Sequence, residues 1–341
     1  MTIRDAIARL LEGRNLLEDQ AAEVIGDVME GQATPAQIGA LLVLLRHKGE
    51  TVAEITGAAR AMRAKVTAVH CEGATVLDTC GTGGDGCGTF NVSTAAGLVA
   101  AAAGCVVAKH GNRAVSGAVG GADVLERLGV SIDMGVEQTE TMLRETGFGF
   151  LFAPLLHGAM RHAAGPRREI GVRTIFNLLG PLTNPAGARH HLLGVFDARW
   201  VEPLAHVLGR LGSAHALVVH GDDGLDELTT TAASDVAELR GGEVRRFRVD
   251  PEALGLKRAR LSDLQVETAD QSAQIIRAVL VGEAGPARDL VLLNAGAAIY
   301  AADRATTIEA GIAAAREAID TGRARDTLER VARASHGGGR P

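Results

Sequence analysis

The stretch 81-GTGGDGCGTFNVST-94 places glycine at positions 81, 83, 84, 86 and 88, followed by a run of small polar side chains. It comes directly after the apolar run 76-VLDTC-80 and before the alanine-rich 91-NVSTAAGLVAAAAG-104, a pattern that predicts a strand, a turn and a helix. Glycine lets a ligand approach the main chain closely. Each glycine also costs conformational entropy on folding, so five glycines in eight residues favour a functional loop over a plain turn. Backbone N–H groups in front of a helix bind anions. The stretch therefore predicts a phosphate site.

Two familiar phosphate motifs do not fit this loop. Residues 81–86 satisfy G-x-G-x-x-G, but a dinucleotide site also needs an acidic residue at the end of the next strand, about 20 residues on. Here the next apolar run, 105-CVVA-108, ends in Lys109 and His110. A P-loop is excluded because no lysine follows the glycines. Lys109 instead suits a second phosphate contact, since adjacent parallel strands end at the same edge of a sheet.

The hydropathy pattern predicts a helical segment followed by a larger α/β segment. Residues 1–70 are expected to form four short helices, and from about residue 74 short apolar runs alternate with helical patterns. We expect strands at 76–80, 105–110, 192–196, 216–221 and 289–296. Such alternation is typical of helices around a mainly parallel sheet. Residues 234–250 alternate about two glycines and predict an antiparallel hairpin.

The composition limits the classes of protein that need to be considered. The chain of 341 residues carries a net charge of -6, which argues against broad attraction to nucleic acids or membranes. No apolar run reaches the ~18 residues of a membrane helix, and the charged start 1-MTIRDAIARLLEGRN-15 contains no signal-peptide block. The four cysteines match no zinc spacing, so we interpret them as reduced thiols of a cytoplasmic protein.

Two further clusters extend the expected site. The segment 219-VHGDDGLDELTTT-231 follows an apolar run, and adjacent carboxylates there suit Mg²⁺, which takes oxygen ligands and bridges phosphates. Its acidic residues are Asp222, Asp223, Asp226 and Glu227. The segment 150-FLFAPLLHGAMRHAAGPRREIGVRTIFNLLGPLTNPAG-187 is rich in arginine, whose planar fork matches a carboxylate. A residue before proline is pushed away from helix, so we expect the helix of Arg167 to begin near Pro166.

These motifs together strongly resemble those of the anthranilate phosphoribosyltransferases, which catalyse the second step of tryptophan biosynthesis. The matching segments, within residues 78–228, are DTCGTGGDG with NVST, KHGNR, GADVLERLGV, FGFLFAPLLH, RREIGVRTIFNLLGPLTNPAG and GLDEL. The resemblance implies transfer of the 5-phosphoribosyl group from phosphoribosyl pyrophosphate to the amine of anthranilate, with two Mg²⁺ ions per site. No catalytic proton acceptor is assigned, because an aromatic amine attacks in its neutral form.

The resemblance also implies a fold and an assembly. The family fold is α/β, with a small discontinuous helical domain and a large α/β domain that has a mainly parallel central sheet. The helical domain would take residues 1–70 with about 166–190 and form a homodimer. The α/β domain would take residues 71–165 with 191–334 and bind the donor. Residues 335–341 are expected to be a disordered tail.

Individual residues acquire roles through the same resemblance. Phosphoribosyl pyrophosphate would contact Gly81, Thr82, Gly83, Gly84, Asp85, Thr89, Asn91, Ser93, Thr94, Lys109, Ser116, Gly117 and Gly121. Anthranilate would lie against Gly81, His110, Asn112, His157, Arg167 and Pro181, with the arginine on its carboxylate. Magnesium would be held by Ser93, Asp226 and Glu227.

The sequence departs from the family pattern after KHGNRAVS, where serines and a basic residue are usual. Here the segment is 117-GAVGG-121. Two interpretations follow: backbone N–H groups of the glycines replace the lost side chains, or the affinity for the donor is reduced. Two other functions stay open at this point. One is a transferase or phosphorylase of the same fold with another nucleophile, and the other is a catalytically inactive relative that binds nucleic acid or a protein partner.

Overall fold

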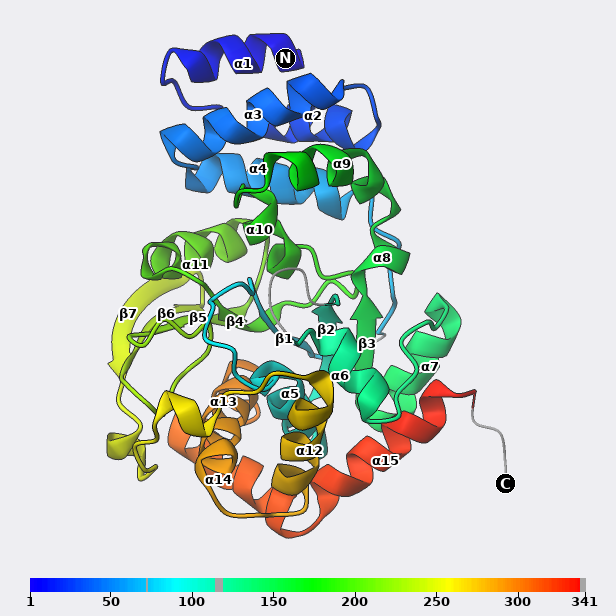
Figure 1. Cartoon of the computed structure of the whole chain (residues 1–341), viewed down its shortest axis with the longest axis vertical. Helices are drawn as coiled ribbons and strands as arrows, with labels where there is room; N and C mark the ends of the chain where they lie inside the picture. The colour runs from blue at the N-terminus through cyan, green and yellow to red at the C-terminus, as the bar shows by residue number, and fades with distance from the viewer. Residues whose placement is uncertain (72, 114–118, 338–341) are drawn as a thin grey trace.

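The computed structural model describes residues 1–71, 73–113 and 119–337. A bundle of helices lies at one end of the molecule, and a seven-stranded sheet with its covering helices forms the rest (Figure 1). The first four helices are α1 (Ile3–Leu11), α2 (Glu18–Met29), α3 (Pro35–Lys48) and α4 (Val52–Arg63). The four helices expected within residues 1–70 are therefore confirmed.

Local sequence signals set the ends of these helices. Thr34 caps α3 by accepting a hydrogen bond from the backbone N–H of Gln37, Pro35 occupies the first turn, and the C-cap is Gly49. Thr51 caps α4 in a capping box with Glu54. The buried Glu54 also accepts a hydrogen bond from the backbone N–H of Leu16 at 2.9 Å. One residue thus both starts α4 and fixes the connection between α1 and α2.

The sheet has the order β3-β2-β1-β4-β5-β6-β7. Its strands are β1 (Val76–Gly81), β2 (Val106–Gly111), β3 (Phe148–Phe152), β4 (His190–Gly194), β5 (His215–Gly221), β6 (Ser234–Arg240) and β7 (Glu243–Val249). The first five strands of that order are mutually parallel, and β6 and β7 add an antiparallel hairpin. The expected parallel sheet and the hairpin within 234–250 are confirmed. Strand β3 was not among the expected strands.

Helices cover both faces of the sheet (Figure 1). Alternate strand residues point to opposite faces. Leu192 and Leu217 join a core with α5 (Val92–Ala102) and the carboxyl-terminal helices. Leu193 and Val218 join a core with α11 (Val201–Arg210) and the bundle. The remaining helices are α6 (Gly121–Arg127), α7 (Val136–Thr146), α8 (Ala153–Leu156), α9 (Arg161–Ile170), α10 (Phe176–Leu179), α11 (Val201–Arg210), α12 (Ala269–Leu280), α13 (Pro286–Ala301), α14 (Ile308–Asp320) and α15 (Arg323–Ser335).

The strand expected at residues 289–296 is wrong, because these residues belong to α13. Every residue of α13 from Leu290 onward is buried, since the helix packs on α5, α14 and β4. A helix buried on all sides is apolar on all sides and has no amphipathic period. A short apolar run of this kind cannot be told from a buried strand by periodicity alone.

The sequence predicted that the helix carrying Arg167 begins near Pro166, and this prediction is wrong. The helix is α9, which begins at Arg161 and has Pro166 in its interior. The preceding residue is Gly165, which has no Cβ to clash with the proline ring. Pro166 is buried, and α9 packs against α2 and α3. Packing against the bundle therefore outweighs the local preference of the proline.

The chain end also differs from expectation. Ser335, placed in a disordered tail by the sequence, is the last residue of α15 and is buried. Its hydroxyl accepts a hydrogen bond from the backbone N–H of Ser131 at 2.9 Å. Residues 338–341 of that tail lie outside the described residues.

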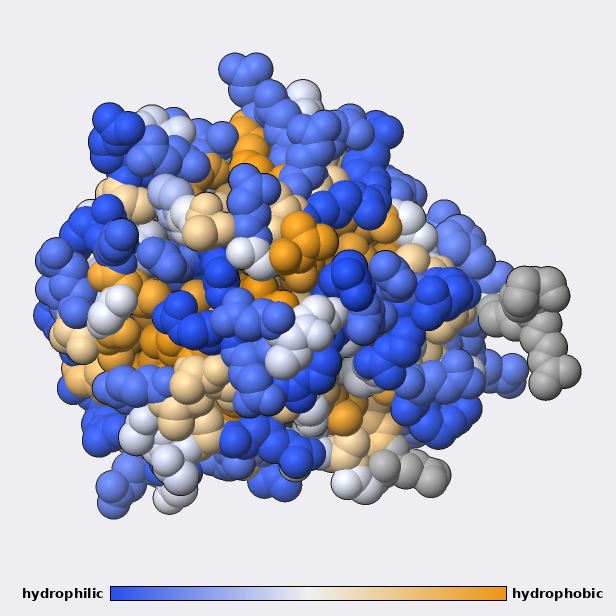
Figure 2. Space-filling model, turned by 90° about the horizontal axis from the view of Figure 1, so that it is seen from below, coloured by the Kyte–Doolittle hydropathy of each residue, from blue (hydrophilic) through white to orange (hydrophobic). Residues whose placement is uncertain are grey.

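No helix in the described ranges has the length and the apolar character needed to cross a membrane. The end of the molecule opposite the helical bundle is mostly hydrophilic, with smaller hydrophobic areas between the polar side chains (Figure 2).

Candidate active site

The candidate site lies at the carboxyl edge of the parallel strands. Glycine ends four of them, as Gly81 of β1, Gly111 of β2, Gly194 of β4 and Gly221 of β5. Ligands of open α/β sheets bind at this edge. The connection after β3 leads into α8, directly below α9 of the helical bundle (Figure 1). The edge therefore faces the helical end of the molecule.

The glycine-rich loop after β1 needs its glycines. Gly83, Gly84, Gly86 and Gly88 all have φ between 66° and 78°, a region that side chains rarely adopt. The loop folds over an acidic residue that lies far away in the sequence. The backbone N–H of Gly83 donates to Asp226 Oδ2 at 2.7 Å. The first half of the expected donor site is thus joined to the expected metal site.

The start of α5 adds polar groups to this loop. Asn91 is the N-cap of α5, and its side-chain oxygen accepts from the backbone N–H of Thr94 at 3.1 Å. The Oγ1 atom of Thr94 is buried and has no hydrogen-bond partner within the described ranges. An added Cβ on Gly121 would lie 3.5 Å from that atom. A buried hydroxyl without a protein partner is free to bond a ligand atom or an ordered water.

Lys109 lies beneath the same loop. Its side chain is 3% exposed, and its ammonium donates to the backbone oxygen of Thr79 and to Ser93 Oγ, the latter at 2.8 Å. Burial lowers the pKa of Lys109. Lys109 and Ser93, which are 16 residues apart, meet because β1 and β2 are adjacent. The second phosphate contact expected from the sequence therefore lies next to the start of α5.

Two carboxylates complete this half of the site. Burial raises the pKa of Asp226 well above its usual value, and the neighbouring Asp85 and Glu227 raise it further. Burial raises the pKa of Glu227 to about 7, although Lys109 opposes the shift. Clustered carboxylates of this kind repel one another when ionised, and their oxygens are the ligands that Mg²⁺ prefers. The carboxylate oxygens of Asp226 and Glu227 are therefore suitable ligands for a magnesium ion.

The other two acidic residues of the 219–231 segment have structural partners. Asp222 forms an ion pair with Arg248. Asp223 accepts hydrogen bonds from the hydroxyl groups of Thr229, at 2.7 Å, and Thr231. Asp223 thus shapes the loop that carries the two site carboxylates, and its backbone oxygen lies 3.9 Å from Sγ of Cys87 in the glycine loop.

A pair of histidines forms the second half of the site. His110 Nδ1 lies 3.0 Å from the carbonyl oxygen of Gly180, and His110 Nε2 lies 3.1 Å from His157 Nε2. A carbonyl only accepts, so Nδ1 of His110 carries the hydrogen and Nε2 accepts from His157. Burial lowers the pKa of His110 to about 3 and that of His157 to about 4. Both rings are therefore neutral at physiological pH.

Arg167 is a cation without an anionic partner in the described part of the chain. Its guanidinium lies over the ring of Phe176, 5.2 Å from the ring centre, and burial lowers its pKa. No hydrogen bond or ion pair links its side chain to another described residue. A partly buried cation without a partner is costly, and a carboxylate ligand would offset that cost.

Two further residues expected in this half adjoin its histidine contacts in the chain. Pro181 follows Gly180, which holds His110, and it is buried. Asn112 follows β2, and its side-chain oxygen accepts from the backbone N–H of Arg113 at 2.7 Å. Ser116 and Gly117, which the sequence predicts to contact the donor, lie outside the described residues.

Two residues important to the geometry received no role from the sequence. Asp78, fully buried in β1, accepts from the backbone N–H of His110 at 3.1 Å and from Asn184 Nδ2 at 2.7 Å. Arg173 donates to the carbonyl oxygen of Gly84 and stacks 4.4 Å from the ring centre of Phe196. Both lie inside motifs that the sequence had singled out, so their position there was the available signal.

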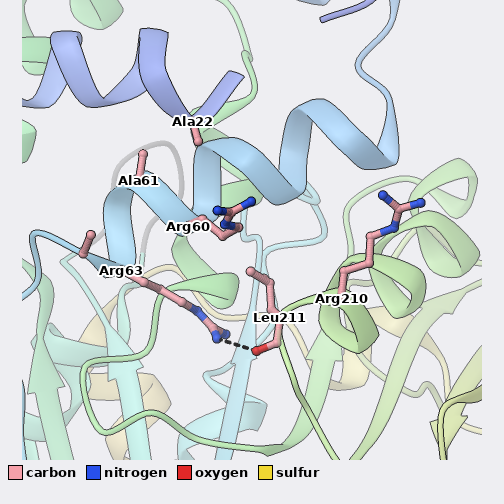
Figure 3. Close-up of a pocket in the computed structure, with 7 residues that line it drawn as sticks. Ala22, Arg60, Ala61, Arg63, Arg210 and Leu211 are labelled. Carbon is pink, nitrogen blue, oxygen red and sulfur yellow. Dashed lines mark hydrogen bonds between the residues drawn. The ribbon is translucent and has the colours of Figure 1, made fainter. Parts of the chain in front are cut away.

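A separate hollow of about 570 Å³ lies where α4 meets the end of α11 (Figure 3). Arg63 crosses it and donates to the backbone oxygens of Leu182 and Leu211, at 2.7 and 3.1 Å. The other arginines that line it, Arg60 and Arg210, both pair with Glu18. Its cations are therefore satisfied by the protein, and the hollow serves as a junction between the bundle and the α/β part.

The sequence matches two family models in the order that the fold displays. The glycosyl transferase family helical bundle domain matches residues 4–66, and the glycosyl transferase family a/b domain matches residues 73–325. The chain is thus a glycosyl transferase of this two-domain class. It is 56% identical over 331 residues to the anthranilate phosphoribosyltransferase of Thioalkalivibrio sulfidiphilus, which covers 97% of this chain and 98% of the relative. The chain belongs to the anthranilate phosphoribosyltransferase family.

Solved structures agree with this assignment. The crystal structure of anthranilate phosphoribosyltransferase from Thermus thermophilus matches with a TM-score of 0.93 and 46% identity, covering 98% of this chain and 100% of the other. The Saccharomyces cerevisiae enzyme in complex with PRPP and Mg matches with a TM-score of 0.89 and 25% identity, covering 98% of each chain. A further structure of the yeast enzyme, at a TM-score of 0.88, 25% identity and coverage of 98% and 97%, contains 4-fluoroanthranilate.

Proposed function

We propose that this chain transfers the 5-phosphoribosyl group from phosphoribosyl pyrophosphate to the amine of anthranilate, giving N-(5-phosphoribosyl)anthranilate and pyrophosphate in tryptophan biosynthesis. The observation that carries the proposal is the pairing of two unlike half-sites. One has a glycine loop, a buried lysine and two carboxylates, and the other has neutral histidines and the unpaired Arg167. A substrate with a diphosphate and a substrate with a carboxylate suit these two halves.

The donor is proposed to lie on the glycine loop and the start of α5. Its phosphates would accept hydrogen bonds from loop N–H groups, from Lys109 and from the unpaired hydroxyl of Thr94. The proposed donor contacts within the described residues are Gly81, Thr82, Gly83, Gly84, Asp85, Thr89, Asn91, Ser93, Thr94, Lys109 and Gly121. Gly121 supports this assignment because it lies beside Thr94 and Lys109, whose atoms are 3.5 and 3.8 Å from the position of an added Cβ.

Magnesium is proposed to bind at Ser93, Asp226 and Glu227, with two ions per site. The PRPP and Mg in the yeast structure support the ion type. When bound, magnesium supplies positive charge to the departing pyrophosphate. Asp226 and Glu227 would give up their retained protons as the metal binds, because their pKa values are raised by burial and by neighbouring carboxylates and the ion binds the deprotonated form.

Anthranilate is proposed to lie between Arg167 and the histidine pair. The fork of Arg167 would hold the carboxylate, and Asn112 and Pro181 would line the same pocket. The aromatic amine is itself neutral at physiological pH, as the attack requires, and the neutral rings of His110 and His157 place no positive charge beside it. Two observations support this placement. Arg167 has no anionic partner among the described residues, and a structure of the yeast enzyme contains 4-fluoroanthranilate.

The chemistry then needs orientation more than proton transfer. The amine nitrogen forms a bond to C1 of the ribose, the C1–oxygen bond to pyrophosphate breaks, and the amine proton leaves to solvent. Lys109 and the loop N–H groups would stabilise the charge that grows on the pyrophosphate. Arg167 and the glycine loop would hold the two substrates in line, which supplies much of the rate enhancement.

We also propose the division into a helical domain of residues 1–70 with about 166–190 and a donor-binding domain of residues 71–165 with 191–334. The packing of α9 and α10 against α2, α3 and α4 supports it. A homodimer through the helical domain is proposed on the exposed apolar side chains of that region. They are Leu11, Leu17 and Val43, at 68%, 63% and 45% exposure.

The test is the loss of anthranilate fluorescence in steady state, with donor and Mg²⁺ both titrated. Turnover at modest donor concentration would support the proposal and would show that segment 117–121 preserves donor affinity. Turnover only at very high donor would keep the reaction and place a defect in that segment, which serines at Gly117, Val119 and Gly121 should correct. A folded protein without turnover at any concentration would sink the proposal.

A further inference from the structure

A second cluster of ionisable side chains lies at the opposite edge of the sheet from the candidate active site. His190 begins β4 and His215 begins β5, and the two residues pair directly in the parallel register. Asp303 approaches them from the turn that follows α13. The ligand atoms of these three side chains all lie within 4.8 Å of one another. Rigid strands and a helix end thus bring together three metal-ligating groups that the proposed reaction does not use.

The contacts of His215 require a positive charge in this cluster. His215 is 1% exposed, and its Nδ1 lies 2.9 Å from Asp303 Oδ1 while its Nε2 lies 3.0 Å from Glu238 Oε1. A neutral imidazole has a single N–H, and a carboxylate offers only lone pairs. If Nε2 donates to Glu238, a cation must lie between Nδ1 and Asp303. That cation is either a second proton or a metal ion.

Two more electron-pair donors converge on the same place. His190 Nδ1 lies 3.8 Å from Asp303 Oδ2 and 2.7 Å from the carbonyl oxygen of Ala301. Ala301 is the last residue of α13, and the carboxyl end of a helix carries partial negative charge that favours a cation. A shared proton would need only His215 and Asp303. A second imidazole and a helix-end carbonyl beside them are what a chelated ion needs.

We propose that His190, His215 and Asp303 bind a divalent transition metal of the zinc type. Imidazole nitrogen with a carboxylate is a donor set suited to Zn²⁺, whereas Mg²⁺ prefers oxygen alone. Glu238 holds the second nitrogen of His215, which is the usual outer partner of a metal-bound histidine. The ion would tie the end of α13 to the first residues of β4 and β5, and would act on stability rather than on the reaction.

Two existing contacts must change when the metal binds. His190 Nδ1 now faces a carbonyl and carries the ring hydrogen, which must move to Nε2 before Nδ1 can bind the ion. Arg240 now bonds Asp303 Oδ1 at 3.0 Å. Its side chain is 51% exposed and can turn to solvent, and an exposed ion pair of this kind contributes little.

The experiment uses the full chain after chelator treatment, with millimolar Mg²⁺ present to occupy oxygen-ligand sites. Zn²⁺ alone is added, and binding is followed by calorimetry and thermal unfolding. We expect one zinc equivalent, a raised melting temperature, and with Co²⁺ the visible absorption of a nitrogen-ligated ion. Asp303→Asn should abolish binding while keeping the backbone, because asparagine tolerates the φ of 54° found there. Glu238→Gln should weaken binding about 10- to 100-fold.

The matched control is His206→Ala, which removes an exposed histidine of α11 and should leave zinc binding unchanged. Three outcomes would overturn the proposal. The first is that zinc shows no saturable binding. The second is that Glu227→Gln removes zinc binding while Asp303→Asn does not. The third is a Co²⁺ spectrum that shows no nitrogen ligands. The last is measured on the unsubstituted chain, so the proposal can fail even where a variant does not fold. Either of the first two would leave His215 as a hydrogen-bond partner of Asp303 and Glu238 alone.

Discussion

The backbone N–H of Gly83 donates a 2.7 Å hydrogen bond to the carboxylate of Asp226, a residue 143 positions further along the chain. The contact joins the loop proposed to hold the donor phosphates to a carboxylate proposed to hold magnesium. A shift of either one moves the other. Binding of the donor and binding of the metal are therefore expected to depend on each other.

Gly81→Ala should impair this coupling without unfolding the protein. The added Cβ would lie 2.5 Å from Asp226 Oδ2, so the carboxylate must move. We expect a rise in the Mg²⁺ concentration needed for half-maximal rate, together with a higher KM for the donor. The control is Gly26→Ala in α2. The added Cβ would meet no atom of another element within 4 Å, and alanine favours the helix. An unchanged Mg²⁺ dependence would contradict the proposed metal site.

The raised pKa of Glu227 predicts a specific pH dependence of stability. Burial raises this pKa from 4.5 to about 7, so the folded protein retains a proton that the unfolded chain has lost. Without metal, the contribution of Glu227 to the free energy of unfolding should fall between pH 4.5 and 7, by on the order of 1–3 kcal/mol. Comparing urea unfolding of the protein and of Glu227→Gln across this range isolates the effect.

Added Mg²⁺ provides the second arm of that experiment. Because the metal binds the deprotonated carboxylate, it should stabilise the protein more at pH 8 than at pH 6. Glu227→Gln should lose most of this difference. Equal stabilisation by Mg²⁺ at both pH values would show that the ion binds elsewhere.

The histidine pair should stay neutral throughout the physiological range. Burial lowers the pKa of His110 to about 3 and of His157 to about 4, so the folded protein binds fewer protons than the unfolded chain below pH 6.5. Their contribution to stability is therefore complete above pH 6.5 and is lost as the pH falls toward 4. Nitrogen-15 NMR should show neutral rings from pH 5 to 8. Protonation near pH 6.5 would exclude the assigned hydrogen-bond directions.

Arg63→Met should weaken the junction between the helical bundle and the α/β part. Arg63 donates to the backbone oxygen of Leu182 and, as Figure 3 shows, to that of Leu211, and its loss leaves both without that donor. We expect a loss of about 1–3 kcal/mol in the free energy of unfolding. Arg60→Met, which removes exposed ion pairs to Glu18 and Asp19, should cost at most about 1 kcal/mol. Equal costs for the two variants in chemical denaturation would contradict this interpretation.

The sequence predicted correctly those structural features that are determined by residues close together in the chain. The cap at Thr34, the glycine loop after β1 and the hairpin at residues 234–250 each follow from residues that lie close together in the chain. Parallel strand order also placed Lys109 near the glycine loop, because strand ends share an edge. These features predict the fold class and the proximity of Lys109 to the glycine loop.

The features that could not be predicted from the sequence depend on packing between residues far apart in the chain. Residues 289–296 form a helix because neighbours surround them on every side, and that burial removes the period by which a helix is recognised. The contact between His110 and His157 arises 47 residues apart, from β2 and the end of α8. The convergence of His190, His215 and Asp303 likewise depends on where α13 ends against the sheet.

Arg167→Met should reduce binding of anthranilate while sparing or raising stability. The guanidinium has no anionic partner in the described chain, so its removal relieves the cost of a partly buried charge. A charged hydrogen bond contributes about 1.5–3 kcal/mol, so we expect the KM for anthranilate to rise roughly 10- to 150-fold. The KM for the donor should change little. Arg168→Met, which removes the exposed neighbouring arginine, is the control for helix effects. If both variants raise the KM for anthranilate equally, Arg167 does not hold the carboxylate.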